Sequence, residues 1–290
     1  MPELPEVEWV VRSLNRTLPG KTVRDVTVLR PRPLRPTAPD LLRTTLTGAT
    51  TQPVERRGKF MIFRFTQPGT KKGQGPLVCA HLGMTGRMDV VPNDAPIPKH
   101  LVVSLDLGRE RFDFVDPRGF GRFSLDATPL DRLGPEPLSD AFTPPVLAEA
   151  MKGSKQAIKV SLLDQSRLAG VGNIYASESL FLAGIHPKRP AGGLREPELV
   201  RLHAAIQTIL NEAIASGSHE TADPSNPLFY YGEDGASGSN SGAQRFRVYD
   251  HAGEPCPRCG KPIERLVQAA RSTFFCAGCQ PLRPAAAKRR

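Results

Sequence analysis

The stretch CPRCGKPIERLVQAARSTFFCAGC, residues 256–279, contains two CxxC pairs with sixteen residues between the inner cysteines. This separation lies within the spacing of a four-cysteine structural zinc site. Each CxxC turn directs two thiolates at one point, and two such turns complete a tetrahedron with no open position. The intervening segments 262–267 and 272–275 suit a zinc-ribbon hairpin. We therefore expect one structural zinc ion, with Cys256, Cys259, Cys276 and Cys279 as its ligands.

Other interpretations of the cysteines remain open at this point. The four could be unrelated structural residues, or one CxxC could be a redox pair, although two matched pairs argue against redox chemistry. The fifth, Cys79, lies in the apolar segment 77–82 and is expected to be an ordinary buried residue. Five unevenly placed cysteines are too few for a disulfide scaffold.

The region before the zinc motif has helical periodicity. We predict four helices, over 146–151, 154–165, 173–183 and 197–215. In the last of them the apolar residues share one face: Leu199, Leu202, Ile206, Ile209, Leu210 and Ala213. The stretch GEDGASGSNSGA, residues 232–243, is predicted to be a flexible loop by its composition.

The N-terminal region has a different pattern. Residues 5–18 form an amphipathic helical repeat that Pro19-Gly20 terminates. Short alternating segments follow, separated in several places by Gly- and Pro-containing turns, which is typical of an antiparallel sandwich or barrel. These expected strands are 22–29, 59–65, 77–82, 101–107, 111–115 and 120–125. A Pro-rich stretch, 135–145, then reads as a linker.

The composition excludes several classes of protein. Proline makes up 29 of 290 residues, about twice the usual share, which argues against a helical bundle or a coiled coil. The net charge of +10 favours a polyanionic partner, either nucleic acid or an anionic membrane. No run reaches the ~18 apolar residues of a membrane span, and the start MPELPEVE is acidic, unlike a secretory leader. We expect a soluble, cytoplasmic protein.

Pro2 offers distinctive chemistry. Removal of Met1 would leave it as a secondary amine at the chain end. A terminal amine titrates near 8, so about a tenth of it is neutral at pH 7, against roughly a thousandth of a lysine. A neutral secondary amine attacks an electrophilic carbon and gives an iminium directly. The carboxyl groups of Glu3 and Glu6 lie close by in sequence and suit protonation of a leaving group or ring oxygen.

Pro2 does not stand alone, because five motifs occur in one order. They are MPELPEVE (1–8), HLGMTG (81–86), DPRGFG (116–121), GVGNIYASE (170–178) and the two CxxC pairs. Together they resemble the bacterial formamidopyrimidine-DNA glycosylases, within the larger family that also holds endonuclease VIII. The resemblance runs from residue 1 to about residue 280.

The resemblance implies an α+β, multidomain fold. The expected parts are an N-terminal antiparallel β-sandwich with an N-terminal helix (1–134), the linker 135–145, a helix–two-turn–helix DNA-binding domain with its flexible loop (146–243), a zinc-ribbon finger (244–281) and a basic disordered tail (282–290). It also implies an enzyme that removes oxidised purines and then nicks the strand by β,δ-elimination. The implied partner is double-stranded DNA with oxidised bases or abasic sites, and the enzyme is expected to be a bacterial, nucleoid-associated monomer.

Residue roles carried over from the family fall on matching positions. Pro2 matches the nucleophile that attacks the sugar C1′, and Glu3 matches the acid that assists opening of the deoxyribose ring. Lys59 matches the lysine of β-elimination, and Arg271 the arginine of δ-elimination and phosphate grip. Without the resemblance, Lys59 and Arg271 would read as ordinary solvated charges.

A second group of matched residues handles the DNA. A glycosylase must extrude its target nucleotide and fill the vacated stack. Met84, Arg118 and Phe120 match the intercalating set, although spacing alone would favour core packing for Met84 and Phe120. The phosphate-contacting and other DNA-touching positions are His81, His100, Lys155, Asn173 and Tyr249. Asn173 could also serve as a helix N-cap, and the two roles are compatible.

The sequence departs from the family pattern in two places. Gly119 stands where a second basic residue usually follows Arg118. The stretch PSNPLFYYGEDGASGSNSGA, 224–243, lacks the family's usual sequence over the extruded purine, which leaves the ranking of lesions open; the aromatic residues 229–231 could stack on a base or pack the loop. Two rival functions also remain: an endonuclease VIII-type enzyme for oxidised pyrimidines, and a zinc-ribbon protein that binds damaged DNA without catalysis.

Overall fold

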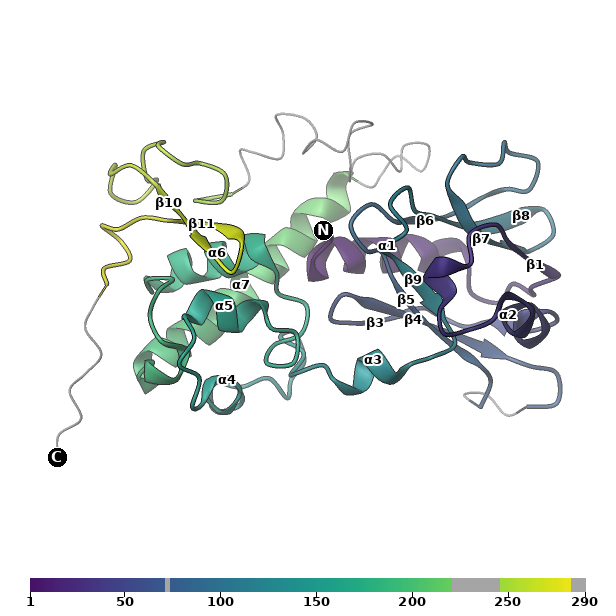
Figure 1. The fold of residues 1–290 in the computed structure, drawn as a ribbon, viewed down its shortest axis with the longest axis horizontal. Coiled ribbons are helices and arrows are strands. Elements are labelled where there is room, and N and C mark those ends of the chain that lie inside the picture. Colours follow the sequence, from purple (N-terminus) through teal and green to yellow (C-terminus); the bar gives the residue numbers. More distant parts are fainter. Residues whose placement is uncertain (71–73, 221–245, 283–290) are drawn as a thin grey trace. The chain divides into compact units, whose positions relative to one another are not determined.

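A computed structural model describes residues 1–70, 74–220 and 246–282 (Figure 1). These residues form two compact units, of which the first contains Met1–Asp131 and the second Arg132–Ser216 with residues 246–282. The expected loop 232–243, the atypical stretch 224–243 and residues 283–290 of the expected tail lie outside the described residues. No helix in the described part is long and apolar enough to cross a membrane.

The first unit begins with α1, Leu4–Thr17, one residue ahead of the predicted helix. Glu3 and Glu6 form a capping box at its start, and the Glu6 carboxylate accepts the Glu3 N–H at 2.9 Å. Val7, Val11 and Leu14 are buried at helical spacing. The cap therefore fixes where the helix begins, and the apolar face fixes how it packs.

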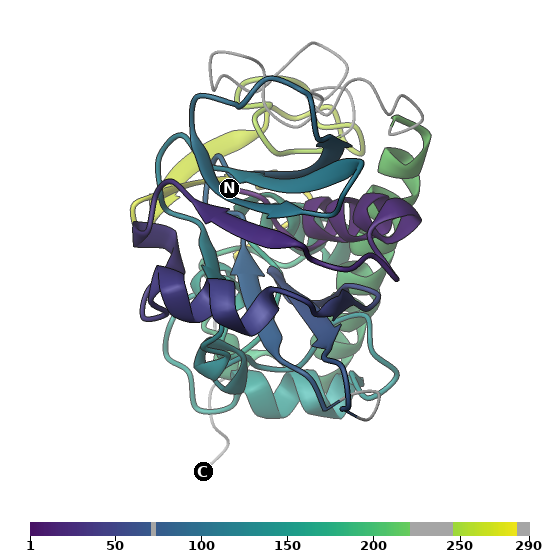
Figure 2. The same ribbon diagram turned by 90° about the vertical axis from the view of Figure 1, so that its right-hand side faces the viewer.

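Two antiparallel sheets form the body of this unit (Figure 1, Figure 2). One has the order β1-β7-β8-β6 and the other the order β2-β4-β5-β9, with β3 paired to β4. Phe63 of β4, Phe112 of β8 and Phe123 of β9 meet with ring centroids 5.4–5.7 Å apart, so the sheets share one aromatic core. The predicted sandwich is confirmed. The strands are Asp25–Val28 (β1), Thr50–Thr51 (β2), Glu55–Arg57 (β3), Phe60–Thr66 (β4), Leu77–His81 (β5), Arg87–Pro92 (β6), Leu101–Asp106 (β7), Glu110–Val115 (β8) and Arg122–Ser124 (β9).

Several elements of this unit differ from the prediction. The strand expected over 22–29 shortens to β1, and that expected over 120–125 shortens to β9. Three strands and three helical segments were not predicted: β2, β3, β6, η1 (Arg32–Leu34), α2 (Pro39–Leu46) and α3 (Thr128–Asp131). These elements are short or lack strict alternation, so tertiary pairing rather than sequence pattern defines them.

The second unit is helical, with α4 (Pro144–Met151), α5 (Ile158–Leu163), α6 (Asn173–Ala183), η2 (Ala191–Gly193) and α7 (Glu196–Glu220). The α6 prediction is matched at both ends, and Gly184 closes that helix in the left-handed conformation. The prediction 154–165 was too long, because the Ile158 N–H donates to the Arg189 carbonyl and Ala157 bridges to Pro190. Residues of the expected linker pack within this unit: the buried Phe142 stacks on His203 at 4.7 Å.

The hairpin of the second unit consists of β10 (Glu264–Gln268) and β11 (Arg271–Phe275). Its two-residue turn, Ala269-Ala270, has φ of 47° and 59°. This left-handed pair suits the right-handed twist of a hairpin but strains alanine, and Gly or Asn is the usual choice. Phe274 and Ile263 bury the hairpin against Phe181 of α6.

Candidate functional site

In the first unit, the predicted nucleophile and acid lie at the start of α1. Pro2 is buried, and Glu3 is only 3% exposed. Glu3 is the N-cap of the helix, where the positive end of the helix dipole favours a carboxylate. The capping box thus fixes Glu3, and Pro2 lies buried directly before it.

Lys59 and His81 lie at the same edge of one sheet of this unit, Lys59 just before β4 and His81 at the end of β5. Lys59 is buried in the turn between β3 and β4, and the next residue, Phe60, is the register partner of His81. The Phe60 and His81 rings are 4.9 Å apart. Desolvation, and then the charge of Lys59, lowers the pKa of His81 to about 4. His81 is therefore neutral at neutral pH. Because its Nδ1 accepts the Gly83 N–H at 2.9 Å, Nε2 carries the proton and is a hydrogen-bond donor.

The three expected intercalating residues lie on exposed turns. Met84 is 39% exposed between β5 and β6, and Phe120 is 51% exposed before β9. Core packing, the alternative that spacing favoured, is wrong for both. The Arg118 guanidinium lies 4.9 Å from the centroid of the Phe120 ring, which is a cation–π contact.

Asp116 connects these two turns and was not predicted as a site residue. Its side chain is fully buried. One carboxylate oxygen accepts the Thr85 hydroxyl at 2.8 Å and the Arg118 N–H at 3.2 Å, and the other accepts the Gly121 N–H at 2.7 Å. Thr85 belongs to the turn that carries Met84, and Arg118 and Gly121 flank Phe120. The Asp116 carboxylate therefore joins these two turns. The signal in the sequence was an Asp placed directly after an apolar strand.

If the chain has the glycosylase activity that the resemblance implies, Asp116→Asn should slow base excision from duplex DNA by about ten- to hundredfold, because displacement of positioning groups by about 1 Å can cost that much. The amide replaces one acceptor oxygen with an NH2 group, so at least one of the three donors loses its acceptor and a buried group is left unpaired. Cleavage of a preformed abasic site, which needs less base extrusion, should fall less. Asp94→Asn, on an exposed turn, is the matched control. Equal losses on both substrates would show a general folding defect.

Gly119 and His100 lie beside the same turn. Gly119 has φ of +66°, a left-handed conformation that favours glycine over the basic residue usual in the family. His100 is half-buried, and its carbonyl accepts the Asp116 N–H at 3.0 Å. The left-handed backbone at position 119 thus gives a structural reason why glycine, and not a basic residue, stands there.

In the second unit, Asn173 and Tyr249 belong to one buried network. The N-cap of α6 is Gly172, so the interpretation of Asn173 as the N-cap is wrong. Asn173 is the first helical residue, and its side-chain amide donates to the Ser272 carbonyl at 3.0 Å and to the Tyr249 hydroxyl at 3.4 Å.

Lys159 is the centre of that network and was not predicted. Its side chain is fully buried, and its ammonium donates to Asn173 at 2.7 Å, to the Thr273 hydroxyl at 3.0 Å and to the Ser272 carbonyl at 3.3 Å. It joins α5, the start of α6 and the zinc hairpin. A lone Lys among the apolar residues of IKVSLL (158–163) was the signal that could have indicated it.

Glu178, in α6, is a further buried charged residue of this unit. Its carboxylate accepts three consecutive backbone N–H groups, those of Arg247, Val248 and Tyr249, at 2.8–2.9 Å. Hydrogen bonds of this kind stabilise a buried carboxylate. Glu178 therefore holds the segment that presents the Tyr249 ring. Lys155 and Arg271 are exposed, and Arg271 is the first residue of β11, directly after the strained turn.

The four cysteines converge as predicted. All four Sγ atoms lie within 4.8 Å of one another; the Cys256–Cys279 pair is 3.8 Å apart and the Cys259–Cys276 pair 3.4 Å apart. Zn–S bonds of about 2.3 Å in a tetrahedron require sulfur atoms about 3.8 Å apart. A Cβ at Gly278 would stand 3.2 Å from the Cys259 sulfur, so this turn has room only for the thiolates. The donor set fits one zinc ion with a closed shell.

Two side chains attach this metal centre to α6. Arg258 lies 4.5 Å from the Phe181 ring centroid and donates to the Phe181 and Leu182 carbonyls at 3.0 and 3.2 Å. Gln280, fully buried, accepts the Cys276 N–H and donates to the Ile185 carbonyl, both at 2.9 Å. The zinc module is thus bound to the helical unit through the end of α6.

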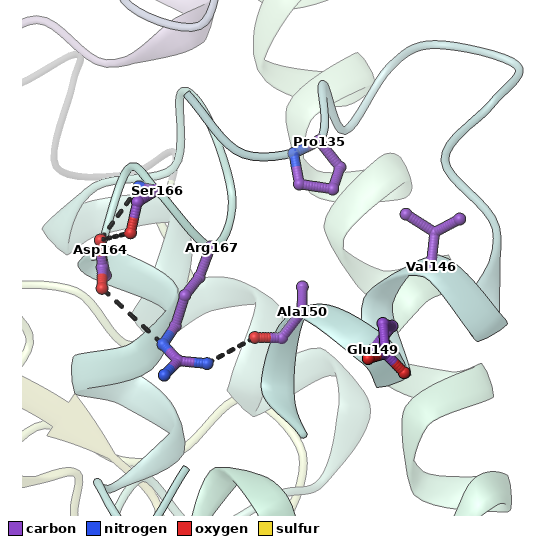
Figure 3. A pocket seen from close by; sticks show the side chains of 7 residues that line it. All are labelled: Pro135, Val146, Glu149, Ala150, Asp164, Ser166 and Arg167. Carbon is purple, nitrogen blue, oxygen red and sulfur yellow. Dashed lines mark hydrogen bonds and ion pairs between the residues drawn. The ribbon is translucent and has the colours of Figure 1, made fainter. Parts of the chain in front are cut away.

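A hollow of about 550 Å³ in the helical unit contains none of the predicted site residues. Its lining includes Asp164 and Arg167, which pair at 3.7 Å, and Arg167 also donates to the Ala150 carbonyl (Figure 3). Asp164 also accepts from Ser166, and Glu149 pairs with Lys152 outside the lining, so nothing in the lining indicates a ligand. The full lining is Pro135, Val146, Glu149, Ala150, Asp164, Ser166 and Arg167.

The fold and this site define a multidomain zinc-finger protein with an N-terminal sandwich and a helical unit. Three family models match it in that order: the formamidopyrimidine-DNA glycosylase N-terminal domain at residues 1–123, the H2TH domain of the same enzymes at 133–225, and the zinc finger found in these enzymes and in IleRS at 253–282. The chain belongs to the formamidopyrimidine-DNA glycosylase family. It is a DNA glycosylase of base excision repair with one zinc ion, and its partner is damaged DNA.

Curated relatives cover nearly the whole chain. Formamidopyrimidine-DNA glycosylases of Symbiobacterium thermophilum and Acidiphilium cryptum are 42% and 43% identical over 97% of this chain, and the alignments cover 90% and 100% of those proteins. Among solved structures, that of Lactococcus lactis formamidopyrimidine-DNA glycosylase bound to DNA with an abasic site has a TM-score of 0.80 at 32% identity, covering 96% of this chain and 99% of the other. The structure of a mutant of the Lactococcus enzyme bound to Fapy-dG DNA has a TM-score of 0.81 at 33% identity, and the match covers 97% of this chain and 100% of the other.

Proposed function

We propose that this protein excises oxidised purines, including formamidopyrimidines and 8-oxoguanine, through a Schiff base on Pro2, and then nicks the strand. One observation carries the proposal: Pro2 is buried beside a buried Glu3 at the capped start of α1. The solved complexes of the Lactococcus enzyme, which contain Fapy-dG or abasic-site DNA, support the same substrate class.

Excision begins with the amine of Pro2 after Met1 has been removed. Its lone pair forms a bond to C1′ of the damaged nucleotide as the bond from C1′ to the base breaks, and the base leaves with that electron pair and takes up a proton. The attacking nitrogen gives up its own proton, which balances the proton that the base takes up, and its lone pair then expels O4′ from C1′ to give the iminium. Glu3 supplies the proton that O4′ gains.

Strand cleavage follows from the iminium. It acidifies the C2′ proton, and removal of that proton expels the 3′ phosphate; Lys59 acts in this β-elimination and on a flanking phosphate. A second elimination expels the 5′ phosphate, with Arg271 gripping it. Each cation offsets the charge of a departing phosphate.

The remaining residues hold the bent DNA. Met84, Arg118 and Phe120 fill the space left by the extruded nucleotide, with Arg118 facing the orphan base. His81 binds phosphate as a neutral Nε2–H donor. The Tyr249 hydroxyl accepts from the Asn173 amide, and in this proposal it contacts a further phosphate. His100 and Lys155 contribute further DNA contacts, and zinc keeps the Arg271 hairpin folded. We place the enzyme, as a monomer, in the bacterial cytoplasm on the nucleoid.

A panel of duplexes tests this function. Duplexes with a formamidopyrimidine or 8-oxoguanine opposite cytosine should be cleaved at least about tenfold faster than a thymine-glycol duplex, because binding contacts built for one base reject others by factors of this size or more. Faster cleavage of thymine glycol would identify an endonuclease VIII-type enzyme. Tight binding to all of them without cleavage would identify a non-catalytic damage sensor.

A further inference from the structure

The connection between β1 and α2 carries a dense group of arginines. Arg30, Arg32 and Arg35, which we call the arginine patch, line a hollow of about 570 Å³ in the first unit. Arg32 and Arg35 are exposed, and Arg30 is half-buried. Three guanidinium groups within six residues create a strongly positive surface.

Within the described residues, no carboxylate forms an ion pair with any arginine of the patch. Arg30 donates to two backbone carbonyls, those of Asp116 and Pro117. Two other arginines of the same unit are paired, Arg12 with Glu8 at 2.8 Å and Arg64 with Glu55 at 2.9 Å. The positive charge of the patch is therefore available to an anion from outside the chain.

The backbone of the patch is rigid. Prolines occupy positions 31, 33, 36 and 39 and fix φ there. The Thr37 hydroxyl bonds to the Ser124 hydroxyl at 2.9 Å, and Arg122 donates to the Arg35 carbonyl at 3.2 Å. These contacts tie the segment to β9, so an anion would bind side chains whose backbone is already ordered, which lowers the entropic cost of binding.

The patch continues the proposed DNA-contacting residues in a definite order. Lys59 precedes β4, His81 ends β5, and Phe120 precedes β9, which follow one another in the sheet. Beyond β9 comes η1, where the Arg32 guanidinium lies 6.0 Å from the Phe120 ring centroid, with Arg118 also on that ring at 4.9 Å. At about 4.8 Å per strand, β9 stands about 10 Å from β4. The wedge thus lies between the phosphate-binding residues and the patch.

We propose that the arginine patch binds backbone phosphates of the undamaged strand, on the far side of the Phe120 wedge from Lys59 and His81. This rests on the proposed function, because it takes Lys59 and His81 as contacts to the damaged strand. Arg32 also touches the wedge ring, so the patch couples grip on the undamaged strand to insertion of Phe120. The planar guanidinium group of arginine presents N–H donors in a geometry that matches two phosphate oxygens.

A double-mutant cycle tests the proposal. Wild type and Arg32→Ala/Arg35→Ala are titrated with a duplex that contains a non-cleavable abasic analogue. The duplex has either native phosphates or neutral methylphosphonates at the three phosphates on each side of the orphan base in the undamaged strand. We expect the variant to bind the native duplex at least about tenfold more weakly and the slope of log K against log salt to fall by about 1.8, at about 0.9 for each phosphate that an arginine no longer neutralises. On the neutralised duplex the two proteins should bind equally.

Each other outcome overturns the proposal. Unchanged affinity of the variant would show that the patch does not contact DNA. If the difference between wild type and variant disappeared when the damaged strand, rather than the undamaged strand, carried the methylphosphonates, the patch would bind the damaged strand and the proposal would be wrong. Arg12→Ala/Arg64→Ala removes the same charge from paired positions and should change the affinity less than twofold. Arg32→Gln/Arg35→Gln repeats the test with longer side chains if alanine disturbs folding. If wild type itself failed to bind the damaged duplex, the proposed function would fail rather than the patch.

Discussion

Retention of Met1 on the mature chain is expected to abolish covalent trapping on abasic DNA in borohydride, by at least about a thousandfold. In that form the Pro2 nitrogen is an amide, whose lone pair is delocalised into the carbonyl and cannot attack C1′. Pro2→Gly should reduce trapping by about a hundredfold or more. Its terminal amine still titrates near 8, but it loses the ring that orients the nitrogen. Reduction of the iminium and gel electrophoresis of the adduct give the measurement.

Pro5→Ala is the control for this experiment, because it changes a proline at the start of the same helix and keeps the Pro2 amine. It should retain trapping within a few-fold. Mass spectrometry establishes which chains have lost Met1. Full trapping in a chain shown to retain Met1 would place the nucleophile elsewhere.

Cys276→Ser is expected to remove the zinc ion and to weaken binding to damaged duplex DNA by at least about a hundredfold. Cys276 is fully buried, and loss of one thiolate opens the closed shell. Zinc binding supplies about 10–16 kcal/mol of folding free energy in small zinc modules, so the hairpin should unfold without it. Ser272 and Thr273 of this hairpin accept hydrogen bonds from Lys159, so unfolding of the hairpin would also break the network around Lys159 and Asn173.

The sandwich should survive this change, because its core lies within the first unit. A thermal melt should therefore still show a cooperative transition for that unit, while metal analysis falls from one zinc per chain to none. Cys79→Ala is the matched control, because Cys79 is buried in β5 of the first unit and is not one of the four clustered cysteines; the variant should keep one zinc. Wild-type DNA affinity in metal-free Cys276→Ser would refute the role of the zinc module.

Much of the fold followed from local patterns. The helices α1 and α6 and the two CxxC turns were predicted closely because their signals are local: a capping residue, a helical apolar period, a terminating glycine and a fixed cysteine spacing. Strands such as β6, RMDVVP, were missed because their alternation is weak and pairing with β8 defines them. The prediction that Cys79 is buried was confirmed.

The candidate site divides in the same way. Pro2, Glu3 and the cysteines could be identified from residue type and position. Asp116, Lys159 and Glu178 left only weak signals in the sequence, because their importance comes from partners as far as 31, 114 and 71 residues away in the chain. A buried charge is recognised only when its donors or acceptors are known.

The sequence by itself determined which chemistry the chain can perform, since a proline amine, two carboxyl groups and four thiols carry their reactivity wherever they lie. Only the tertiary structure decided that Met84 and Phe120 project from turns, that Asn173 is not a cap, and that the arginine patch adjoins the wedge. Reactivity is a property of covalent groups, whereas exposure and pairing depend on what distant segments bury.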